Sequence, residues 1–177
     1  AGVLGARGPG TLEESGVAHP SVIQMGPLGK ALGSFGAFVA GTKALIDLLI
    51  TKSRPFIFTT ALPPAICAAS IEAINIVEEE PSRRARLKEN YEYLRTGLEA
   101  KGLQTLGSTQ IIPVIVGDAE KAVKASERLL EAGVFIQAIR PPTVPPGSSR
   151  LRITMMATHT KADLDLAIDV IKDALNG

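Results

Sequence analysis

The sequence predicts an α/β protein, and three observations lead to that class. Short apolar segments bounded by glycine or proline alternate with longer segments whose apolar residues recur at helical spacing. The 177 residues, 45% of them hydrophobic and 21% charged, are enough for one large core or two small ones. A long segment of helical spacing, residues 82–101, divides a glycine-rich first part from a second part in which strands and helices alternate. We therefore expect two α/β parts connected by a helix.

The chain begins with twenty residues that are rich in glycine and proline and are predicted to form a surface loop. Because no strand or helix precedes this loop, we expect the chain to be a piece of a longer protein. The apolar segments predicted as strands are residues 21–25, 37–40, 56–60, 111–116, 134–139 and 150–156. The segments predicted as helices are residues 42–51, 65–78, 82–101, 118–132 and 160–176.

In the first part, suitable residues mark where the predicted helices begin. Thr42 can cap the helix 42–51 with its hydroxyl. The pair Pro63-Pro64 fits the start of the helix 65–78, because proline is tolerated in the first helical turn. The apolar face of the helix 65–78 is wide, which predicts a position in the interior or against a partner subunit.

In the second part, the pattern predicts a compact α/β sandwich of about 70 residues. The helix 82–101 carries a narrower apolar stripe and is expected to lie half in water, with Gly102 just after its end. Pro113 falls inside the predicted strand 111–116. This position favours an edge strand or a bulge, since proline cannot donate a backbone hydrogen bond.

The bulk composition narrows the function classes. The net charge of +1 gives no field that would favour nucleic acid or an anionic membrane as partner, so a small molecule is expected. Cys67 is the one cysteine, which excludes an internal disulfide and fits a reducing compartment. No apolar run reaches the roughly 20 residues of a spanning helix, and the N-terminus lacks the pattern of a signal peptide. We expect a cytoplasmic protein.

A lysine among glycines, in MGPLGKALGSFG at residues 25–36, is the first candidate site. A phosphate-binding P-loop is excluded, because that motif needs Ser or Thr after its lysine and Ala31 follows Lys30. One interpretation is a tight turn with Lys30 in solvent. The other is an imine-forming lysine, since an amine in a partly desolvated pocket loses affinity for its proton and becomes nucleophilic toward an aldehyde. Pyridoxal phosphate is the obvious aldehyde.

A stiff, arginine-containing segment, AIRPPTVPPGSSRLR at residues 138–152, is the second candidate site. Arginine binds carboxylates through two parallel hydrogen bonds, and prolines fix where the guanidinium points. Arg150 and Arg152 alternate on one face of the predicted strand. The alternative is a proline-rich surface loop whose arginines lie in water. His19 and His159 fall in turns and are more typical of structural roles, and no spacing of carboxylates and histidines predicts a metal site.

These two segments, together with RPFIFTTALPPA at residues 54–65 and RITMMATHT at residues 152–160, resemble the α-oxoamine synthases. These are pyridoxal-phosphate enzymes of the type I aminotransferase fold. The resemblance covers all 177 residues but only about the C-terminal half of such an enzyme. It implies that residues 1–80 are the C-terminal part of the large, cofactor-binding domain, residues 81–102 a connecting helix, and residues 103–177 the small C-terminal α/β domain.

Within the family, the AIRPPTVP run separates this chain from glycine C-acetyltransferase and 5-aminolevulinate synthase. It resembles the branch of biotin biosynthesis, which implies a decarboxylative condensation of L-alanine with a pimeloyl thioester. The resemblance implies that Lys30 forms the imine with the cofactor aldehyde and also moves the Cα proton. It implies that Arg152 holds the carboxylate of the amino acid.

The resemblance also assigns two pairs of residues at the edge of the site. Arg140 and Thr143 lie where the family lines the acyl-substrate side. Thr59 and Thr60 match hydroxyl residues that reach the cofactor phosphate of the neighbouring subunit, which implies a homodimer with shared active sites.

Two departures from the family pattern stand out. Pro27 occupies the position, three residues before the lysine, where the family has a hydroxyl that binds the cofactor phosphate; the lost bond costs about 1.5–3 kcal/mol of cofactor affinity. The segment GVLG at residues 2–5 resembles the sequence that follows an Asp-x-x-His motif, whose aspartate pairs with the cofactor ring nitrogen. We therefore expect the chain alone to be inactive, with the N-terminal half as a separate piece, or to be a noncatalytic module derived from such an enzyme.

Overall fold

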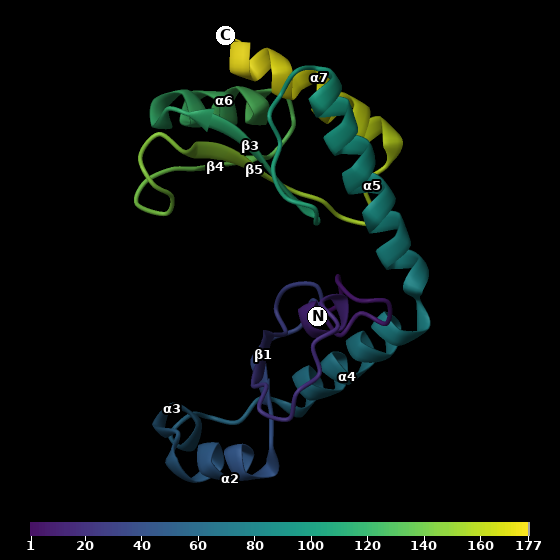
Figure 1. The fold of residues 1–177 in the computed structure, drawn as a ribbon, viewed down its shortest axis with the longest axis vertical. Helices are drawn as coiled ribbons and strands as arrows, with labels where there is room; N and C mark the ends of the chain where they lie inside the picture. The colour runs from purple at the N-terminus through teal and green to yellow at the C-terminus, as the bar shows by residue number, and fades with distance from the viewer. Residues whose placement is uncertain (177) are drawn as a thin grey trace. The chain divides into compact units, whose positions relative to one another are not determined.

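A computed structural model describes residues 1–176 and shows two compact units, residues 1–84 and the residues from Ala85 onward (Figure 1). Within the described residues, no helix is both long enough and apolar enough to cross a membrane.

The first unit opens with a glycine-rich loop, as predicted for the first twenty residues, but a short helix interrupts it. The helix is α1, Thr11–Glu14. Before it, the backbone N–H of Gly2 donates to the carbonyl of Gly8 at 2.7 Å, and that of Gly10 donates to the carbonyl of Leu4 at 3.0 Å. Gly2 and Gly8 have φ values of +80° and +86°, which residues with a side chain rarely adopt. The glycines therefore let this segment fold back on itself.

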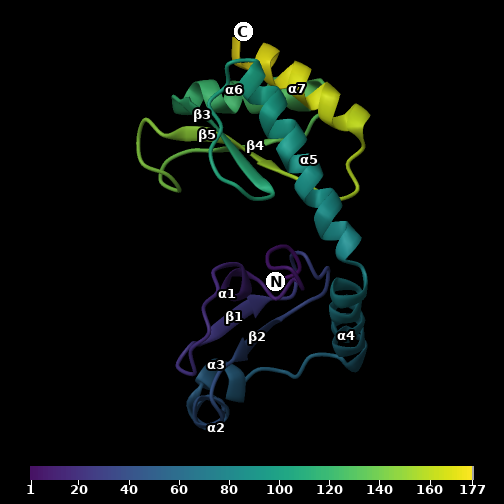
Figure 2. The same cartoon turned by 45° about the vertical axis from the view of Figure 1, so that its right-hand side comes forward.

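A two-stranded antiparallel hairpin follows. It consists of β1, Gln24–Pro27, and β2, Ala37–Ala40, with Gln24 opposite Ala40 and Pro27 opposite Ala37 (Figure 2). The second strand lies where the sequence predicts it, whereas the first begins three residues later than predicted.

Helix α2, Lys43–Lys52, follows the hairpin and begins as predicted. The hydroxyl of Thr42 accepts a hydrogen bond from the N–H of Leu45 at 3.3 Å. This bond satisfies one of the donors that are free at a helix start.

The strand predicted for residues 56–60 is wrong. The structure has a short helix, α3, Arg54–Ile57, in which the carbonyl of Ser53 accepts hydrogen bonds from the N–H groups of Phe56 and Ile57. Proline in the first turn favours this helix. The apolar run that suggested a buried strand is exposed here, and Phe58 retains 75% of its accessible surface.

Helix α4, Pro64–Glu79, begins at the predicted proline. The side of α4 that carries Ile66, Ala73 and Val77 is half-buried, whereas Ile71 is 62% exposed and Ile74 is 45% exposed. Contact with a partner subunit, the other predicted position, stays a prediction. The next helix, α5, Pro81–Ala100, starts after Glu80, within one residue of the predicted start.

The second unit contains a three-stranded antiparallel sheet of β3, Ile111–Gly117, β4, Gln137–Ile139, and β5, Ser149–Thr154, in the order β3-β5-β4. Pro113 lies in β3, which is an edge strand of this sheet, and the register shifts between Ile115 and Gly117. The prediction of an edge or bulged position is confirmed. The helices of this unit after α5 are α6, Ala119–Glu131, and α7, Lys161–Asn176.

One face of this sheet packs against the helices and forms the core of the second unit. Figure 1 shows α6 and α7 along the same side of the sheet. The sheet contributes paired residues that are almost fully buried, Ile112 opposite Ile153 and Val114 opposite Leu151. The helical partners in the same cluster are Leu94, Leu98, Ala125, Leu129, Leu164, Ile168, Ile171 and Ala174. The other face of β5 carries the arginines of the second candidate site.

Candidate functional site

The lysine segment forms a tight loop between β1 and β2. The N–H of Leu28 donates to the carbonyl of Gly36 at 2.8 Å, and the N–H of Ser34 donates to the carbonyl of Leu28 at 3.0 Å. Inside this frame, the N–H of Gly33 donates to the carbonyl of Lys30 at 3.0 Å, which closes a four-residue turn. The side chain of Lys30 is exposed, as in the tight-turn interpretation, and the described residues do not give it the partly desolvated surroundings of the imine interpretation. The loop therefore fixes the backbone of Lys30 and presents its amine outward.

A pair of serines links the lysine loop to helix α4. The hydroxyls of Ser34 and Ser70 are 2.7 Å apart, and the hydroxyl of Ser70 donates to the carbonyl of Ile66 at 2.8 Å. Ser70 is buried in the wide apolar face of α4. Sequence reasoning missed this link. The available signal was a serine inside an otherwise apolar helix face, which needs a hydrogen-bond partner.

The glycines of the loop leave room for a ligand beside the lysine. At Gly33 an added Cβ would meet nothing within 4 Å, and at Gly29 its nearest neighbour would be the carbonyl of Ser34 at 3.4 Å. Gly26, by contrast, lies against the ring of Phe38, where a Cβ would come within 2.5 Å. The open side of the loop is thus the side of Gly29 and Gly33, next to Lys30.

Thr59 and Thr60 lie in the irregular segment after α3, and both are exposed. They belong to the same unit as Lys30. Their hydroxyls are therefore accessible to a ligand or to another chain.

In the second unit, Arg152 lies on the outer face of β5. Its Nη2 donates to Oε1 of Gln137 at 3.2 Å, and the two residues are paired across β4 and β5. The neighbouring Arg150 donates from Nε to the carbonyl of Ser148 at 3.0 Å and is half-buried. Arg150 therefore supports the turn before β5, while Arg152 is exposed and has donors left for an anion.

Arg152 also lines a cavity of about 580 Å³ together with Gln137, Met155, Met156 and His159. The imidazole Nδ1 of His159 accepts a hydrogen bond from the N–H of Met156 at 3.3 Å, which agrees with a structural role.

At the start of α7, beside this cavity, the N–H and hydroxyl of Thr160 both donate to Asp163, each at 2.7 Å. These bonds lower the pKa of the Asp163 carboxyl, so the cavity wall is anionic at this point.

Arg140 and Thr143 lie in the turn that follows β4, where the N–H of Thr143 donates to the carbonyl of Arg140 at 3.1 Å. Both side chains are exposed, and neither belongs to the described residues that line the cavity. The structure thus brings Arg140 and Thr143 into one turn, and Arg152 together with Gln137.

Residues 4–171 match the profile of a family described as aminotransferase class I and II. The chain belongs to the aminotransferase class I and II family. The predicted fold class is confirmed. The chain is α/β and has the fold of the C-terminal part of a type I pyridoxal-phosphate-dependent transferase.

Two similar curated relatives share one name. The chain is 51% identical over 173 residues to 8-amino-7-oxononanoate synthase of Geotalea daltonii, a match that covers 96% of this chain and 44% of the relative. It is 53% identical over 170 residues to the synthase of the same name from Geobacter metallireducens, covering 94% of this chain and 44% of that relative. The chain therefore spans less than half the length of these relatives.

Solved structures agree with the family. Serine palmitoyltransferase of Sphingomonas wittichii superposes with a TM-score of 0.91 at 30% identity, covering 98% of this chain and 44% of that one. 8-Amino-7-oxononanoate synthase from Francisella tularensis superposes with a TM-score of 0.88 at 29% identity, covering 99% of this chain and 52% of that one. The resemblance to the α-oxoamine synthases is confirmed by these relatives.

Proposed function

We propose that this chain is part of a cytoplasmic pyridoxal-phosphate-dependent acyltransferase of biotin biosynthesis. The reaction is the condensation of L-alanine with a pimeloyl thioester to give 8-amino-7-oxononanoate, carbon dioxide and the free thiol carrier. The observation that carries the proposal is the exposed Lys30 on a glycine loop, within a chain about half identical to synthases of that name.

The residues around Lys30 are compatible with the proposed cofactor. A flat ring and its phosphate must approach the backbone closely, and the open space beside Gly29 and Gly33 allows this approach. When bound, the cofactor supplies an electron sink that stabilises negative charge on the Cα of the amino acid. Pro27 offers no hydroxyl to the phosphate, so we expect weaker cofactor binding than in a chain with Ser or Thr there.

Lys30 and Arg152 have the two central roles in this proposal. The Nζ of Lys30 would hold the cofactor through its aldehyde group, and would accept and return the proton at Cα of the amino acid. The guanidinium of Arg152, oriented by Gln137, holds the substrate carboxylate through two parallel hydrogen bonds.

The remaining site residues have supporting roles. Arg140 and Thr143, in their exposed turn, line the side of the acyl substrate. The exposed hydroxyls of Thr59 and Thr60 would hold the cofactor phosphate of the neighbouring subunit, and the active form would then be a homodimer. In this proposal the chain alone has little activity, because residues outside it complete the site.

A different α-oxoamine synthase is the second candidate. It is favoured by the superposition on serine palmitoyltransferase, and glycine C-acetyltransferase is another member of the same class. These enzymes differ in the amino acid that they condense, so the choice of amino acid separates them from the first candidate.

An absorbance titration tests the proposal. Pyridoxal phosphate is added to the chain, and the band of the lysine-bound cofactor near the visible edge is recorded for the wild type, Lys30→Ala and Lys43→Ala. Lys43 is the control because it is an exposed lysine of the same unit, paired with Asp47. The expected result is a band that only Lys30→Ala removes. No band at millimolar cofactor, or one that survives Lys30→Ala, contradicts the proposal and supports a noncatalytic module.

The amino acid is then varied in the cofactor-loaded protein. L-Alanine is expected to change the spectrum at lower concentration than glycine or L-serine. A preference for glycine or L-serine overturns the assignment to the biotin branch while leaving the cofactor chemistry in place.

A further inference from the structure

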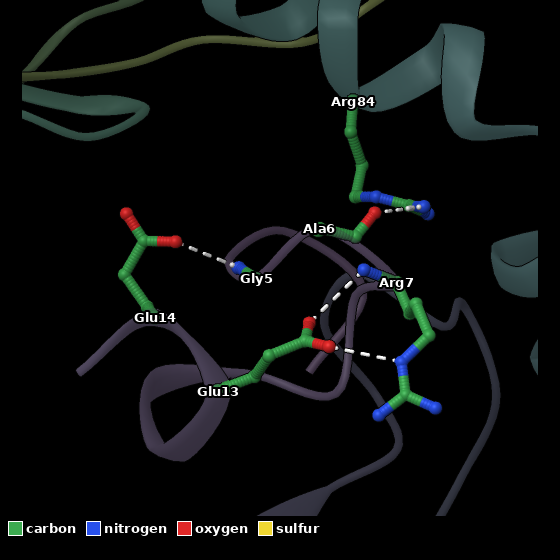
Figure 3. Close-up of polar contacts among 6 residues, drawn as sticks. All are labelled: Gly5, Ala6, Arg7, Glu13, Glu14 and Arg84. Atoms are coloured by element: carbon green, nitrogen blue, oxygen red, sulfur yellow. Dashed lines mark hydrogen bonds and ion pairs between the residues drawn. The ribbon is translucent and has the colours of Figure 1, made fainter. Parts of the chain in front are cut away.

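Residues 1–10, called here the glycine loop, are held by two carboxylates of α1 (Figure 3). Oε2 of Glu14 accepts a hydrogen bond from the N–H of Gly5 at 3.0 Å. Glu13 accepts two bonds from Arg7, one from the backbone N–H at 3.0 Å and one from Nε at 2.9 Å. The carboxylates therefore fix the backbone of the loop at Gly5 and Arg7.

Arg84 holds the same loop from the other direction (Figure 3). Its Nη2 donates to the carbonyl of Ala6 at 2.9 Å, and its Nη1 donates to the carbonyl of Val77 in α4. A guanidinium is planar and always charged, so it connects two carbonyls in a fixed geometry. Arg84 thus links the glycine loop to the end of helix α4.

The glycine loop is in close contact with Ala31, the residue that follows Lys30. A Cβ added at Gly2 would be 3.0 Å from the Cβ of Ala31 and 3.7 Å from Cγ2 of Val77. At Gly8, which is buried, an added Cβ would be 2.6 Å from Cγ1 of Val77 and 3.1 Å from Nη1 of Arg84. The loop therefore packs tightly against Ala31 and Val77, with its glycines at the closest points.

We propose that Arg84 is a positioning residue for Lys30. Arg84 holds the glycine loop against Ala31, Glu13 and Glu14 fix the rest of the loop, and the Ser34–Ser70 link holds the far end of the lysine loop. The lysine loop is then supported at both ends, so that the amine of Lys30 is presented in one place. The inference rests on the role proposed for Lys30.

The charge state of Glu13 supports the same arrangement of the glycine loop. The side-chain hydrogen bond from Arg7, together with its backbone N–H, lowers the pKa of the Glu13 carboxyl below its ordinary value, and the positive charge of Arg84 acts in the same direction. Glu13 is therefore ionised at neutral pH, which is the state that accepts both hydrogen bonds.

The test compares Arg84→Met, Arg84→Lys and the control Arg83→Met in the full chain. Arg83 is the adjacent arginine on α5 and is paired with Glu80 on the surface. The first readout needs no cofactor and is the hydrogen exchange of the amides of Leu28, Gly33 and Ser34, which close the lysine loop. The second is the cofactor concentration that gives half of the absorbance band described above.

Arg84→Met is expected to speed exchange of the lysine-loop amides and to raise the half-saturating cofactor concentration, each by about tenfold, the factor expected for loss of a charge-assisted hydrogen bond. Arg84→Lys restores part of both effects, and Arg83→Met changes neither. Unchanged exchange and unchanged cofactor binding in folded Arg84→Met overturn the inference. If the wild type gives no band, the proposed function fails, and the exchange data still decide whether Arg84 supports the loop.

A second pair of variants covers the case in which Arg84→Met does not fold. Gly2→Ala pushes directly on Ala31 without removing a hydrogen bond, and Gly16→Ala is its control. Gly16 also has a positive φ, +63°, but nothing lies within 4 Å of its added Cβ. Faster exchange at Gly33 and Ser34 in Gly2→Ala alone supports the inference; equal behaviour of the two variants contradicts it.

Discussion

The two units of this chain are stabilised in different ways. In the second unit, sheet and helices share one continuous core in which Leu94, Leu98, Leu129 and Leu151 have no exposed surface. Among residues 1–84, all of which the structure describes, Leu28 is the one buried hydrophobic residue, and it still retains 8% of its accessible surface. The large hydrophobic residues of the first unit that remain exposed are Val17, Ile23, Met25, Phe35, Val39, Leu48, Ile50, Phe56, Ile57, Phe58, Leu62, Ile71 and Ile74.

This difference shows which forces hold each unit. Burial of apolar area is the dominant favourable term in folding, so the second unit has the means to fold by itself. In the first unit, specific polar links carry more of the local order, namely those of Glu13, Arg84 and the pair Ser34–Ser70. The candidate cofactor lysine belongs to the unit with the small core, so its placement depends on those links.

The largest expected effect contrasts two isoleucines on helices. Ile171→Ala removes a side chain that is 0% exposed in the core of the second unit and is expected to lower the free energy of unfolding by about 2–5 kcal/mol. Ile71→Ala truncates a side chain that is 62% exposed and is expected to change the free energy of unfolding by less than about 0.5 kcal/mol. Urea denaturation followed by circular dichroism measures both. Equal costs would contradict the contrast between the units.

A close helix contact in the second unit gives the next largest effect. A Cβ at Gly97 of α5 would lie 2.3 Å from Cδ1 and 3.0 Å from Cγ1 of Ile168 in α7. Gly97→Ala is therefore expected to lower the free energy of unfolding by about 1–3 kcal/mol through overpacking. Thr96→Ala, at an exposed position of the same helix, is the control and should be near neutral. A stabilised Gly97→Ala chain would show that the two helices adjust freely.

One helix cap in each unit allows the effect of losing a single hydrogen bond to be compared. Asp118 caps α6 by accepting from the N–H of Lys121 at 2.8 Å, and Thr42 caps α2 by accepting from Leu45. Asp118→Ala is expected to cost about 1 kcal/mol of unfolding free energy, because α6 packs on the core. Thr42→Ala should speed exchange of the Leu45 amide while leaving the main unfolding transition in place, because α2 contains no buried residue. A large shift of that transition would show that the two units unfold together.

The smallest effect concerns the titration of Tyr93 in the second unit. Its hydroxyl donates to Oδ1 of Asp165 at 2.5 Å, and this hydrogen bond is the main reason that the pKa of Tyr93 is raised. The nearby Lys161 lies 5.2 Å from the ring centroid. Because the folded pKa is raised, this stabilisation is present at neutral pH and is lost as the pH rises through the folded pKa of Tyr93.

Ultraviolet titration of tyrosinate measures this shift. Asp165→Asn should move the titration of Tyr93 to lower pH. An unchanged titration curve in that variant would exclude Asp165 as the cause.

Sequence patterns predicted the second unit well because its pattern and its packing agree. Apolar residues recur at the spacing that places them on one face, and that face is buried. The strand predicted for residues 56–60 failed because a short apolar run does not reveal whether a partner strand exists. In the first unit the run is exposed and forms a helical turn after Ser53 instead.

The candidate site was predictable in part. The glycine turn around Lys30 and the outward position of Arg152 follow from local sequence. The links that hold the lysine loop do not, because Ser34 meets Ser70 from 36 positions away and Arg84 meets Ala6 from 78 positions away. A single sequence does not show which polar residues, this far apart along the chain, form hydrogen bonds with each other.

The central claim is that Lys30 carries the cofactor, and reductive trapping tests it most directly. The chain is incubated with pyridoxal phosphate, reduced with borohydride and digested, and the added mass is mapped along the peptides. The label is expected to be concentrated on Lys30 at substoichiometric cofactor. Label spread evenly over other exposed lysines such as Lys43 and Lys52, with Lys30 no more modified than they are, would contradict it.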